Sequence, residues 1–409
     1  MRDLDGRAAP SERRANPADR QVFKDSFLMA SRAAADHLTA AGAEALAGIA
    51  ADRLWLRPAG LLSGAAAATA LAEGLALPLA ASGLAFPLVE MLGRWPDGGV
   101  TTALVPVAQL REWSKQGAAA LAGRIDQQLE RLAMPRPAWA GLALERPLLM
   151  GIVNVTPDSF SDGGEFMAAD QAIRQGRALL DEGADILDVG GESTRPGATP
   201  VPAEEEVRRI EPVVRALAAV GALVSVDTRH ARVMAAALAA GARIINDVSA
   251  LAGEPESLAV AARSRAPVVL MHMPGDPRTM QDNPSYTLAS LDVLEYLAAR
   301  VDACFAAGIP RERIVVDPGI GFGKRSAHNL DIMTRLALFH ALGCGVLLGL
   351  SRKGLIGHVG GGLSPKERMP GSVAGALYGV SQGVQILRVH DVAATRQAIA
   401  TWQAIAAGA

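Results

Sequence analysis

From residue 147 onward, short apolar runs alternate with longer stretches of helical character, and each run ends in a polar residue. The runs read PLLMGIVNVT, ILDVGG, LVSVDT, IINDVS, VVLMH, IVVDPG, VLLGLS and ILRVH. Strands that alternate with helices predict parallel βα units, and near-continuous Val, Ile and Leu predict strands covered on both faces. Eight such units in about 260 residues match the usual size of a closed barrel. We therefore expect an α/β fold, with a (β/α)8 TIM barrel over residues 146–409.

The polar strand ends are the main indication of function. In a (β/α)8 barrel the C-terminal strand ends converge on one mouth, where the active site is built. Residues that are far apart in sequence would then share one site: Asn154, Glu192, Asp227, Asn246, His272, Asp317, Ser351, Lys353, Arg388 and His390. An open doubly wound sheet is the alternative, but no glycine-rich dinucleotide motif follows the first strand.

The chain upstream of the barrel has a different composition. We expect a mobile N-terminus over residues 1–20, because it is charged and contains proline. Residues 21–145 are rich in Ala and Leu and predict a smaller, mostly helical domain, in which Arg57 and Glu90 are interpreted as solvated surface charges. Helical patterns lie near residues 25–50, 62–75 and 107–133. The stretch MPRPAWAG before the barrel reads as a linker.

Composition excludes several classes of function. The net charge of −2 gives no bulk electrostatic case for binding nucleic acid or an anionic membrane surface. The longest apolar stretch, residues 61–89, is interrupted by a glutamate and two prolines, which argues against a membrane span. Cys304 and Cys344 lack metal-ligand spacing and are interpreted as buried, reduced thiols. Together with the lack of a secretory signal, this predicts a cytoplasmic protein.

The first two loops of the predicted mouth carry polar and glycine-rich sequence. Asn154 begins NVTPDSFSDGG and offers a neutral oxygen suited to Mg²⁺ that is held mainly by a substrate phosphate, although a turn or capping role is the alternative. Arg195, in GGESTRPGA, provides a guanidinium fork for a phosphate or carboxylate. A solvated arginine in a surface turn is the alternative there.

The next strand ends carry candidate ligand-binding groups. Asp227 and Asn246 follow apolar residues, and a buried Asp is costly unless it is paired or used. These two residues could instead bond to each other or cap helices. Asp317 lies at the tip of the sixth strand, in DPGIGFGK, where three glycines allow a ligand to approach the backbone. Phe322, between two of these glycines, packs in the core or is exposed for stacking.

The last two strands add hydrogen-bond donors and cations. Lys353 can donate to a carbonyl or ring nitrogen, and Ser351 can hold a carboxylate. Arg388 and His390 alternate with a valine, so they point to the same side of the last strand and predict an anion site. His272 is either a satisfied core histidine or a member of the site.

Taken together, these motifs resemble dihydropteroate synthase of the folate pathway over roughly residues 147–406. All of them, from NVTPDSFSDGG to RVHDV, occur in the order of that family. The resemblance implies a transferase that condenses 6-hydroxymethyl-7,8-dihydropterin diphosphate with p-aminobenzoate, releasing pyrophosphate and 7,8-dihydropteroate. It also implies a Mg²⁺ cofactor and a homodimer formed through barrel helices.

The resemblance assigns roles to individual residues. The pterin is expected to bind Asp227, Asn246, Asp317 and Lys353. The diphosphate and Mg²⁺ are expected at Asn154, Arg388 and His390. The p-aminobenzoate pocket is expected to form from Thr194, Arg195, Pro196, Phe322, Ser351 and the methylenes of Lys353. Asp227, Lys353 and Arg195 are the expected catalytic residues, whereas Glu192 and His272 are expected to support the site.

These roles favour a dissociative substitution without a covalent enzyme intermediate. Loss of diphosphate leaves a pterin-stabilised cation, and a carboxylate such as Asp227 at ~4–5 Å stabilises it by roughly 3–4 kcal/mol at an effective dielectric of ~20. Three alternatives are a pterin-binding methyltransferase, a non-catalytic pterin-binding relative, and a scaffold whose role is defined by the extension. The resemblance does not cover the N-terminal extension.

Overall fold

The structure is a computed structural model that describes residues 49–116, 119–155, 165–193, 200–276 and 278–407. Within these residues, eight parallel strands close into a barrel in the order β10, β11, β12, β13, β6, β7, β8 and β9. The closed barrel confirms the predicted (β/α)8 fold and excludes the open sheet. Its strands are β6 (Leu148–Asn154), β7 (Ile186–Gly190), β8 (Val224–Asp227), β9 (Ile244–Asp247), β10 (Val268–Met271), β11 (Ile314–Asp317), β12 (Gly345–Leu348) and β13 (Ile386–Val389).

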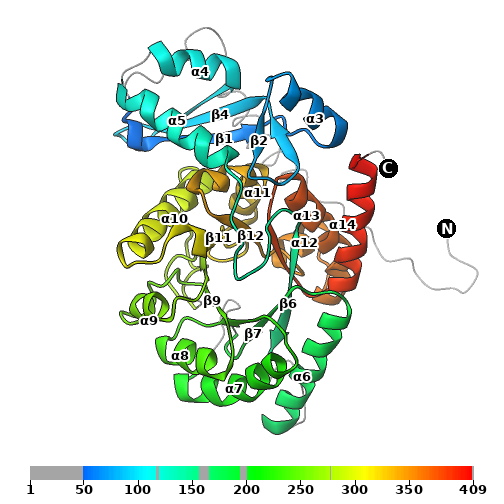
Figure 1. Cartoon of the computed structure of the whole chain (residues 1–409). Coiled ribbons are helices and arrows are strands. Elements are labelled where there is room, and N and C mark those ends of the chain that lie inside the picture. The colour runs from blue at the N-terminus through cyan, green and yellow to red at the C-terminus, as the bar shows by residue number, and fades with distance from the viewer. Residues whose placement is uncertain (1–48, 117–118, 156–164, 194–199, 277, 408–409) are drawn as a thin grey trace, which may run out of the picture.

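Helices surround these strands and connect them in sequence (Figure 1). They are α6 (Glu165–Asp181), α7 (Ala203–Ala219), α8 (Ala231–Ala240), α9 (Ser257–Ser264), α10 (Ala289–Ala306), η3 (Arg311–Arg313), α11 (Ser326–Thr334), η4 (Leu336–Leu342), α12 (Gly354–Val359), η5 (Pro365–Arg368), α13 (Met369–Ser381) and α14 (Val392–Ala407). Between β11 and β12 the helical segment is divided, because α11 ends at Thr334 and the 3-10 segment η4 follows.

The register of the strands aligns several polar ends at one level of the barrel. Asn154 pairs with Gly190 across β6 and β7, and Gly190 pairs with Asp227 across β7 and β8. Asp227 in turn pairs with Asn246 across β8 and β9. Parallel strands in register therefore bring residues from four separate βα units to the same rim, as the sequence predicted.

The opposite end of the barrel is closed by the segment that was read as a linker. Trp139 is 1% exposed and packs with Leu144 against the first residues of the barrel strands. Its Nε1 donates to the carbonyl oxygen of Arg313 at 3.0 Å. Arg136 is also buried and donates to the carbonyl oxygens of His340 and Cys344, both at 3.0 Å. The segment lacks regular structure, as its prolines predict, but it forms the base of the core.

The described part of the N-terminal extension combines sheet and helix. A three-stranded antiparallel sheet has β4 at its centre, and β2 and β3 form a separate pair. The elements are η1 (Ala51–Arg53), β1 (Leu54–Ala59), α3 (Gly64–Ala72), β2 (Leu77–Leu79), β3 (Leu84–Phe86), β4 (Leu88–Arg94), β5 (Val100–Pro106), α4 (Val107–Gln116) and α5 (Ala119–Ala133). A mostly helical domain was expected, but strand pairing over 54–59, 88–94 and 100–106 adds a sheet.

The extension lies against the helices on one side of the barrel (Figure 1). Arg94 forms ion pairs with Asp292 and Glu295 of α10. At α3 the contact is close, since a Cβ atom added to Gly64 would lie 2.0 Å from the carbonyl oxygen of Ala406. The position of α3 therefore depends on the end of α14.

The interpretation of Arg57 and Glu90 as solvated surface charges was wrong. Their side chains form an ion pair and are only 20% and 12% exposed, respectively. Arg335, at the end of α11, approaches the same carboxylate at 3.5 Å. Strand pairing of β1 with β4 places the two residues opposite each other, which sequence spacing alone does not reveal.

Two expectations from composition can be compared with the described residues. Cys304 and Cys344 are both buried and free, as predicted. None of the helices described in the structure combines the length and the apolar character that a membrane span needs.

Candidate active site

Polar side chains from four strands meet inside the mouth of the barrel. Asp188 of β7 is fully buried, and its Oδ2 accepts hydrogen bonds from Arg388 Nε at 2.6 Å and Asn246 Nδ2 at 2.9 Å. Arg388 Nη2 donates to Asp227 Oδ2 at 2.7 Å. Asp188 therefore fixes both Arg388 and Asn246, and Arg388 in turn fixes Asp227.

Asp188 is absent from the residues predicted from the sequence. Its signal is present in ILDVGG, where an acid interrupts an apolar strand and must be paired if the strand is buried. The sequence interpretation passed over it, because Glu192 was taken as the polar residue of this strand. The structure places Glu192 two residues beyond the end of β7.

Asp227 retains capacity to accept further hydrogen bonds. Its Oδ1 is buried and has no hydrogen-bond partner within the described residues. Burial raises the pKa of Asp227 to about 7, although the Arg388 cation opposes the rise and Asp188 adds to it. An acceptor without a partner at the centre of a buried site indicates a ligand that donates a hydrogen bond there.

Asp317 and Lys353 lie beside this group, around Gly349. Asp317 Oδ1 accepts from the backbone N–H of Gly319 at 2.7 Å, and Lys353 Nζ donates to the carbonyl oxygen of Ile320 at 2.6 Å. A Cβ atom added to Gly349 would lie 3.5 Å from Asp317 Oδ2 and 3.6 Å from Lys353 Nζ. Glycine at this position therefore leaves space between the acid and the ammonium group.

The two charged groups have shifted pKa values. Burial lowers the pKa of Lys353 to about 8, while Asp317 opposes that shift and Arg388 adds to it. Burial also raises the pKa of Asp317, against the effect of Lys353 and of its bond from Gly319. For Arg388, burial disfavours the charge, but Asp188 and Asp227 outweigh it and raise its pKa. Perturbed groups clustered in one place are typical of functional sites.

Phe322, an expected wall of the p-aminobenzoate pocket, packs beside Lys353. The Lys353 Nζ atom lies 4.5 Å from the centroid of the Phe322 ring, which is within cation–π range. The ring is partly exposed and packs against Val248, Met271, Met273 and Met280. The partly exposed ring therefore lies next to the ammonium group of Lys353.

His272 is held by Lys324, a residue that sequence reasoning did not single out. Lys324 Nζ contacts His272 Nδ1 at 2.9 Å and donates to the carbonyl oxygens of Gly319 at 2.8 Å and Phe322 at 2.9 Å. Burial lowers the pKa of His272 to about 2, so the ring is neutral and can accept from the ammonium group. His272 is thus a satisfied buried histidine, and Lys324 ties the loop after β11 to the end of β10.

Arg388 and His390, which are expected to form an anion site together, have different partners. Arg388 binds Asp188 and Asp227, whereas His390 Nδ1 and Ser351 Oγ lie 3.0 Å apart. The backbone N–H of His390 also donates to Ser351 Oγ at 3.2 Å. Ser351 is thus oriented by strand β13 at the edge of the mouth.

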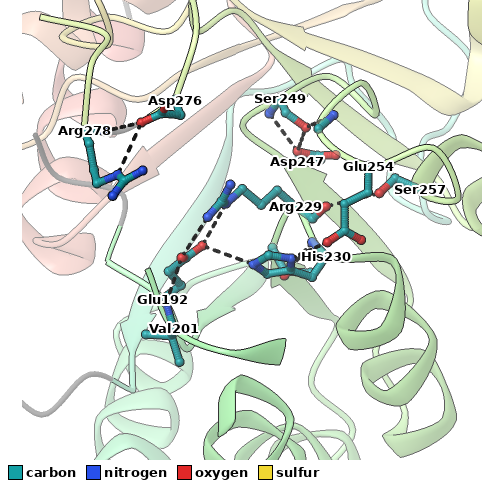
Figure 2. A network of polar contacts seen from close by, with 12 residues as sticks. Glu192, Val201, Arg229, His230, Asp247, Ser249, Glu254, Ser257, Asp276 and Arg278 are labelled. Carbon is teal, nitrogen blue, oxygen red and sulfur yellow. Dashed lines mark hydrogen bonds and ion pairs between the residues drawn. The ribbon is translucent and has the colours of Figure 1, made fainter. Parts of the chain in front are cut away.

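Glu192 belongs to a neighbouring network. Its two oxygens accept from Arg229 Nε at 3.0 Å and Nη2 at 3.1 Å, and Figure 2 shows these contacts beside His230. A carboxylate with both oxygens hydrogen-bonded in this way fits a supporting role rather than direct contact with reactants. Thr194, Arg195 and Pro196 lie outside the described residues, as does most of the NVTPDSFSDGG loop.

Asn154 ends β6 and is partly buried at the rim. Among the described residues, one group of His, Cys, Asp and Glu side chains has metal-ligand proximity, namely Glu192, Glu206 and His230, and it does not include Asn154. A single neutral amide oxygen is a suitable protein ligand for Mg²⁺ that keeps its other ligands from substrate phosphate and water. The residues present at the rim therefore fit a magnesium ion that arrives with a phosphorylated substrate.

Comparisons with known proteins agree with this geometry. Residues 150–390 match the family described as pterin binding enzyme. The chain is 48% identical over 281 residues to the dihydropteroate synthase of Neisseria meningitidis serogroup B, covering 66% of this chain and 99% of the relative. It is 47% identical over 268 residues to the dihydropteroate synthase of Haemophilus influenzae, covering 65% and 96%.

Solved structures give the same result. The dihydropteroate synthase of Xanthomonas albilineans with 4-aminobenzoic acid has a TM-score of 0.62 and 50% identity, covering 65% of this chain and 96% of that one. The same enzyme in complex with 7,8-dihydropteroate has a TM-score of 0.59 and 47% identity, covering 64% and 95%. The family match begins at residue 150, so the N-terminal extension lies outside it.

Proposed function

The chain belongs to the pterin binding enzyme family, and we propose that it condenses 6-hydroxymethyl-7,8-dihydropterin diphosphate with p-aminobenzoate to give 7,8-dihydropteroate and pyrophosphate. The chain is therefore an enzyme of the transferase class. The curated relatives reported above are named as dihydropteroate synthases, which favours this reaction over methyl transfer or a non-catalytic role.

The observation that carries the proposal is the buried polar cluster at the mouth. Asp317 offers a carboxylate and Lys353 an ammonium group beside the space left by Gly349, while Asp227 offers a carboxylate and Asn246 an amide in the network around Arg388 and Asp188. A pterin presents amine and N–H donors along one edge and acceptors on the other. The ring donors would bond to the carboxylates and the Asn246 amide oxygen, while Lys353 would donate to a ring acceptor.

The diphosphate is proposed to lie at the rim, between the ends of β6 and β13. These strands are neighbours in the barrel, so Asn154 and His390 approach the same region although 236 positions separate them in the chain. Asn154 would contribute an oxygen to a bound Mg²⁺, which neutralises diphosphate charge and so makes it a better leaving group. Among the described residues, the bonds of Arg388 to the two acids use Nε and Nη2, which leaves Nη1 for the diphosphate.

The proposed chemistry places Asp227 next to the carbon that loses diphosphate. The bond between that carbon and the diphosphate oxygen breaks first, and both electrons leave with the oxygen. A carboxylate ~4–5 Å from the resulting cation stabilises it by roughly 3–4 kcal/mol at an effective dielectric of ~20. The p-aminobenzoate nitrogen then attacks the carbon and loses a proton. Arg388 keeps the Asp227 carboxylate oriented during these steps.

The p-aminobenzoate ring is proposed to stack between Phe322 and the methylenes of Lys353. Ser351 would donate to its carboxylate, with Thr194, Arg195 and Pro196 completing the pocket. Burial of the reacting atoms keeps water from capturing the cation before the amine does. The homodimer and the cytoplasmic location expected from the sequence remain part of this proposal, and sedimentation analysis of the purified chain tests the first.

The test is a condensation assay on the full chain with both substrates and Mg²⁺. We expect dihydropteroate and pyrophosphate in equal amounts, and slow pyrophosphate release when p-aminobenzoate is omitted. Absence of dihydropteroate would reject the proposed reaction. Pyrophosphate release that strictly requires p-aminobenzoate, or a covalent adduct on the chain, would reject the dissociative order of steps.

A further inference from the structure

Next to the mouth, three elements bring together a second cluster of buried acceptor groups. Glu192 follows β7, Glu206 lies in the first turn of α7, and His230 precedes α8. One ligand atom from each lies within 4.8 Å of the others. Glu206 is fully buried, and the side chains of Glu192 and His230 are 5% and 15% exposed. None of the roles proposed above uses this cluster.

The orientation of His230 resembles that of a metal ligand. Its Nδ1 lies 2.5 Å from Glu254 Oε1, so the Nδ1–H donates to that carboxylate (Figure 2). The second oxygen of Glu254 accepts from the backbone N–H of Ala231 at 2.8 Å, which fixes the carboxylate. This tautomer leaves the lone pair of His230 Nε2 directed at Glu192, whose Oε2 is 3.8 Å away. Histidines that bind metals commonly donate their other ring N–H to a carboxylate in this way.

Glu206 provides an independent indication of a cation. Both of its oxygens and His230 Nε2 are buried without a hydrogen-bond partner in the described part of the chain. The Thr228 hydroxyl is nearby but does not reach hydrogen-bond geometry with Glu206. Buried acceptors that face one another are unfavourable unless a proton or a metal cation lies between them.

We propose that Glu192, Glu206 and His230 form a binding site for one divalent transition-metal cation of the zinc type. One imidazole nitrogen and two carboxylate oxygens are ligands that zinc and cobalt accept, whereas Mg²⁺ and Ca²⁺ prefer oxygen alone. Atoms no more than 4.8 Å apart leave a central point at most about 2.8 Å from each, so bonds of about 2.0–2.2 Å need only small side-chain movements.

The surrounding charges balance such a cation. Its two positive charges and that of Arg229 are matched by the carboxylates of Glu192, Glu206 and Glu254. Glu192 Oε1 accepts from both Arg229 and the backbone N–H of Val201, whereas Oε2, the oxygen nearer His230, accepts from Arg229 alone and keeps a second lone pair for the metal. The bound cation would join the ends of β7 and β8 to α7, so the site is structural and distinct from the magnesium proposed at Asn154.

Cobalt(II) titration of the chelator-treated full chain tests this site, because four- and five-coordinate Co²⁺ has strong visible absorption bands. We expect one Co²⁺ per chain, displacement by Zn²⁺ but not by millimolar Mg²⁺, and a higher Tm of the metal-bound protein. Glu206→Gln removes one ligand charge and keeps the side-chain volume, and we expect at least tenfold weaker binding. His230→Asn is a second variant with the same expected effect.

Glu204→Gln is the matched control on the same helix, since the Glu204 side chain is 57% exposed and pairs with Arg232 instead. It should bind Co²⁺ as the wild-type chain does. The proposal is overturned if the wild-type chain shows no saturable binding at one equivalent, which would leave a shared proton as the cation between the acceptors. It is also overturned if folded Glu206→Gln and His230→Asn bind Co²⁺ with unchanged affinity.

Discussion

The two ends of the barrel are built from the same strands but differ in what fills them. At the base, Trp139 and Leu144 pack against apolar strand residues, and the polar atom of the tryptophan binds a backbone carbonyl. At the mouth, Asp188 and Asp227 are paired with Arg388, yet each keeps one buried oxygen without a partner in the described residues. The base is thus organised for stability, and the mouth keeps binding capacity for a ligand.

The largest effect on stability is expected from opening the base. Trp139→Ala removes a fully buried aromatic side chain and should lower the free energy of unfolding by about 3–5 kcal/mol. Chemical denaturation measures this loss, and kcat of the folded variant should stay near the wild-type value. Trp139→Phe, which loses mainly the Nε1 bond, should cost less. A large fall in kcat with unchanged stability would contradict the division between base and mouth.

At the mouth the expected effect is on catalysis. Lys353→Met keeps the length of the side chain but removes its charge and its donors, so we expect kcat/KM for the pterin diphosphate to fall about 10- to 100-fold, or roughly 1.5–3 kcal/mol. Steady-state kinetics measures the change. Lys366→Met, at an exposed position in η5, is the control and should leave kcat/KM unchanged. If the two variants had the same kcat/KM, Lys353 would not be a residue of the site.

Two glycines close in sequence offer a matched pair for the comparison. A Cβ added to Gly349 meets Asp317 and Lys353 at ordinary contact distances, so Gly349→Ala should fold normally but raise KM for the pterin diphosphate about tenfold. A Cβ added to Gly345 lies 3.0 Å from Val315 Cγ2 in the base, so Gly345→Ala should cost about 1–3 kcal/mol of stability and leave KM unchanged. If Gly349→Ala lowered stability and Gly345→Ala raised KM instead, the proposed difference between the mouth and the base would be contradicted.

The smallest change is expected from pH alone. Asp227 must be ionised and Lys353 protonated, and their pKa values are about 7 and about 8. Since Asp227 loses its charge below pH 7 and Lys353 loses its charge above pH 8, kcat/KM should be bell-shaped, with a maximum between these values and about tenfold loss per pH unit outside them. A flat profile from pH 6 to pH 9 would argue against these protonation states.

Much of this architecture could be predicted from the sequence. The strand ends at Asp227, Asn246 and Asp317 follow from apolar runs of barrel length, because parallel strands place their C-terminal ends together. Asp188 is visible in the sequence as an acid within an apolar strand, but its pairing with Arg388 is not, because that partner lies 200 positions away. The ion pair of Arg57 with Glu90 depends on the register of β1 with β4, which the short strands of the extension do not specify.

Some site predictions cannot be compared with the structure. Thr194, Arg195 and Pro196 lie outside the described residues, so their role in p-aminobenzoate binding stays a prediction. The expected cation pair of Arg388 and His390 illustrates a different limit. The alternation of Arg388 and His390 with a valine predicts that both side chains face the same side of β13. The position of the Arg388 guanidinium, however, is determined by the acids of β7 and β8 that it binds.

The central claim, that the mouth forms and stabilises a pterin cation, is tested most directly by kcat of Asp227→Asn in the condensation assay. The substitution keeps the shape of the side chain and removes its charge. We predict that kcat falls several hundredfold, in line with roughly 3–4 kcal/mol of lost stabilisation, while Tm does not fall. Asp302→Asn, at a position 67% exposed on α10, should retain wild-type kcat. Wild-type kcat in a folded Asp227→Asn variant would contradict the account.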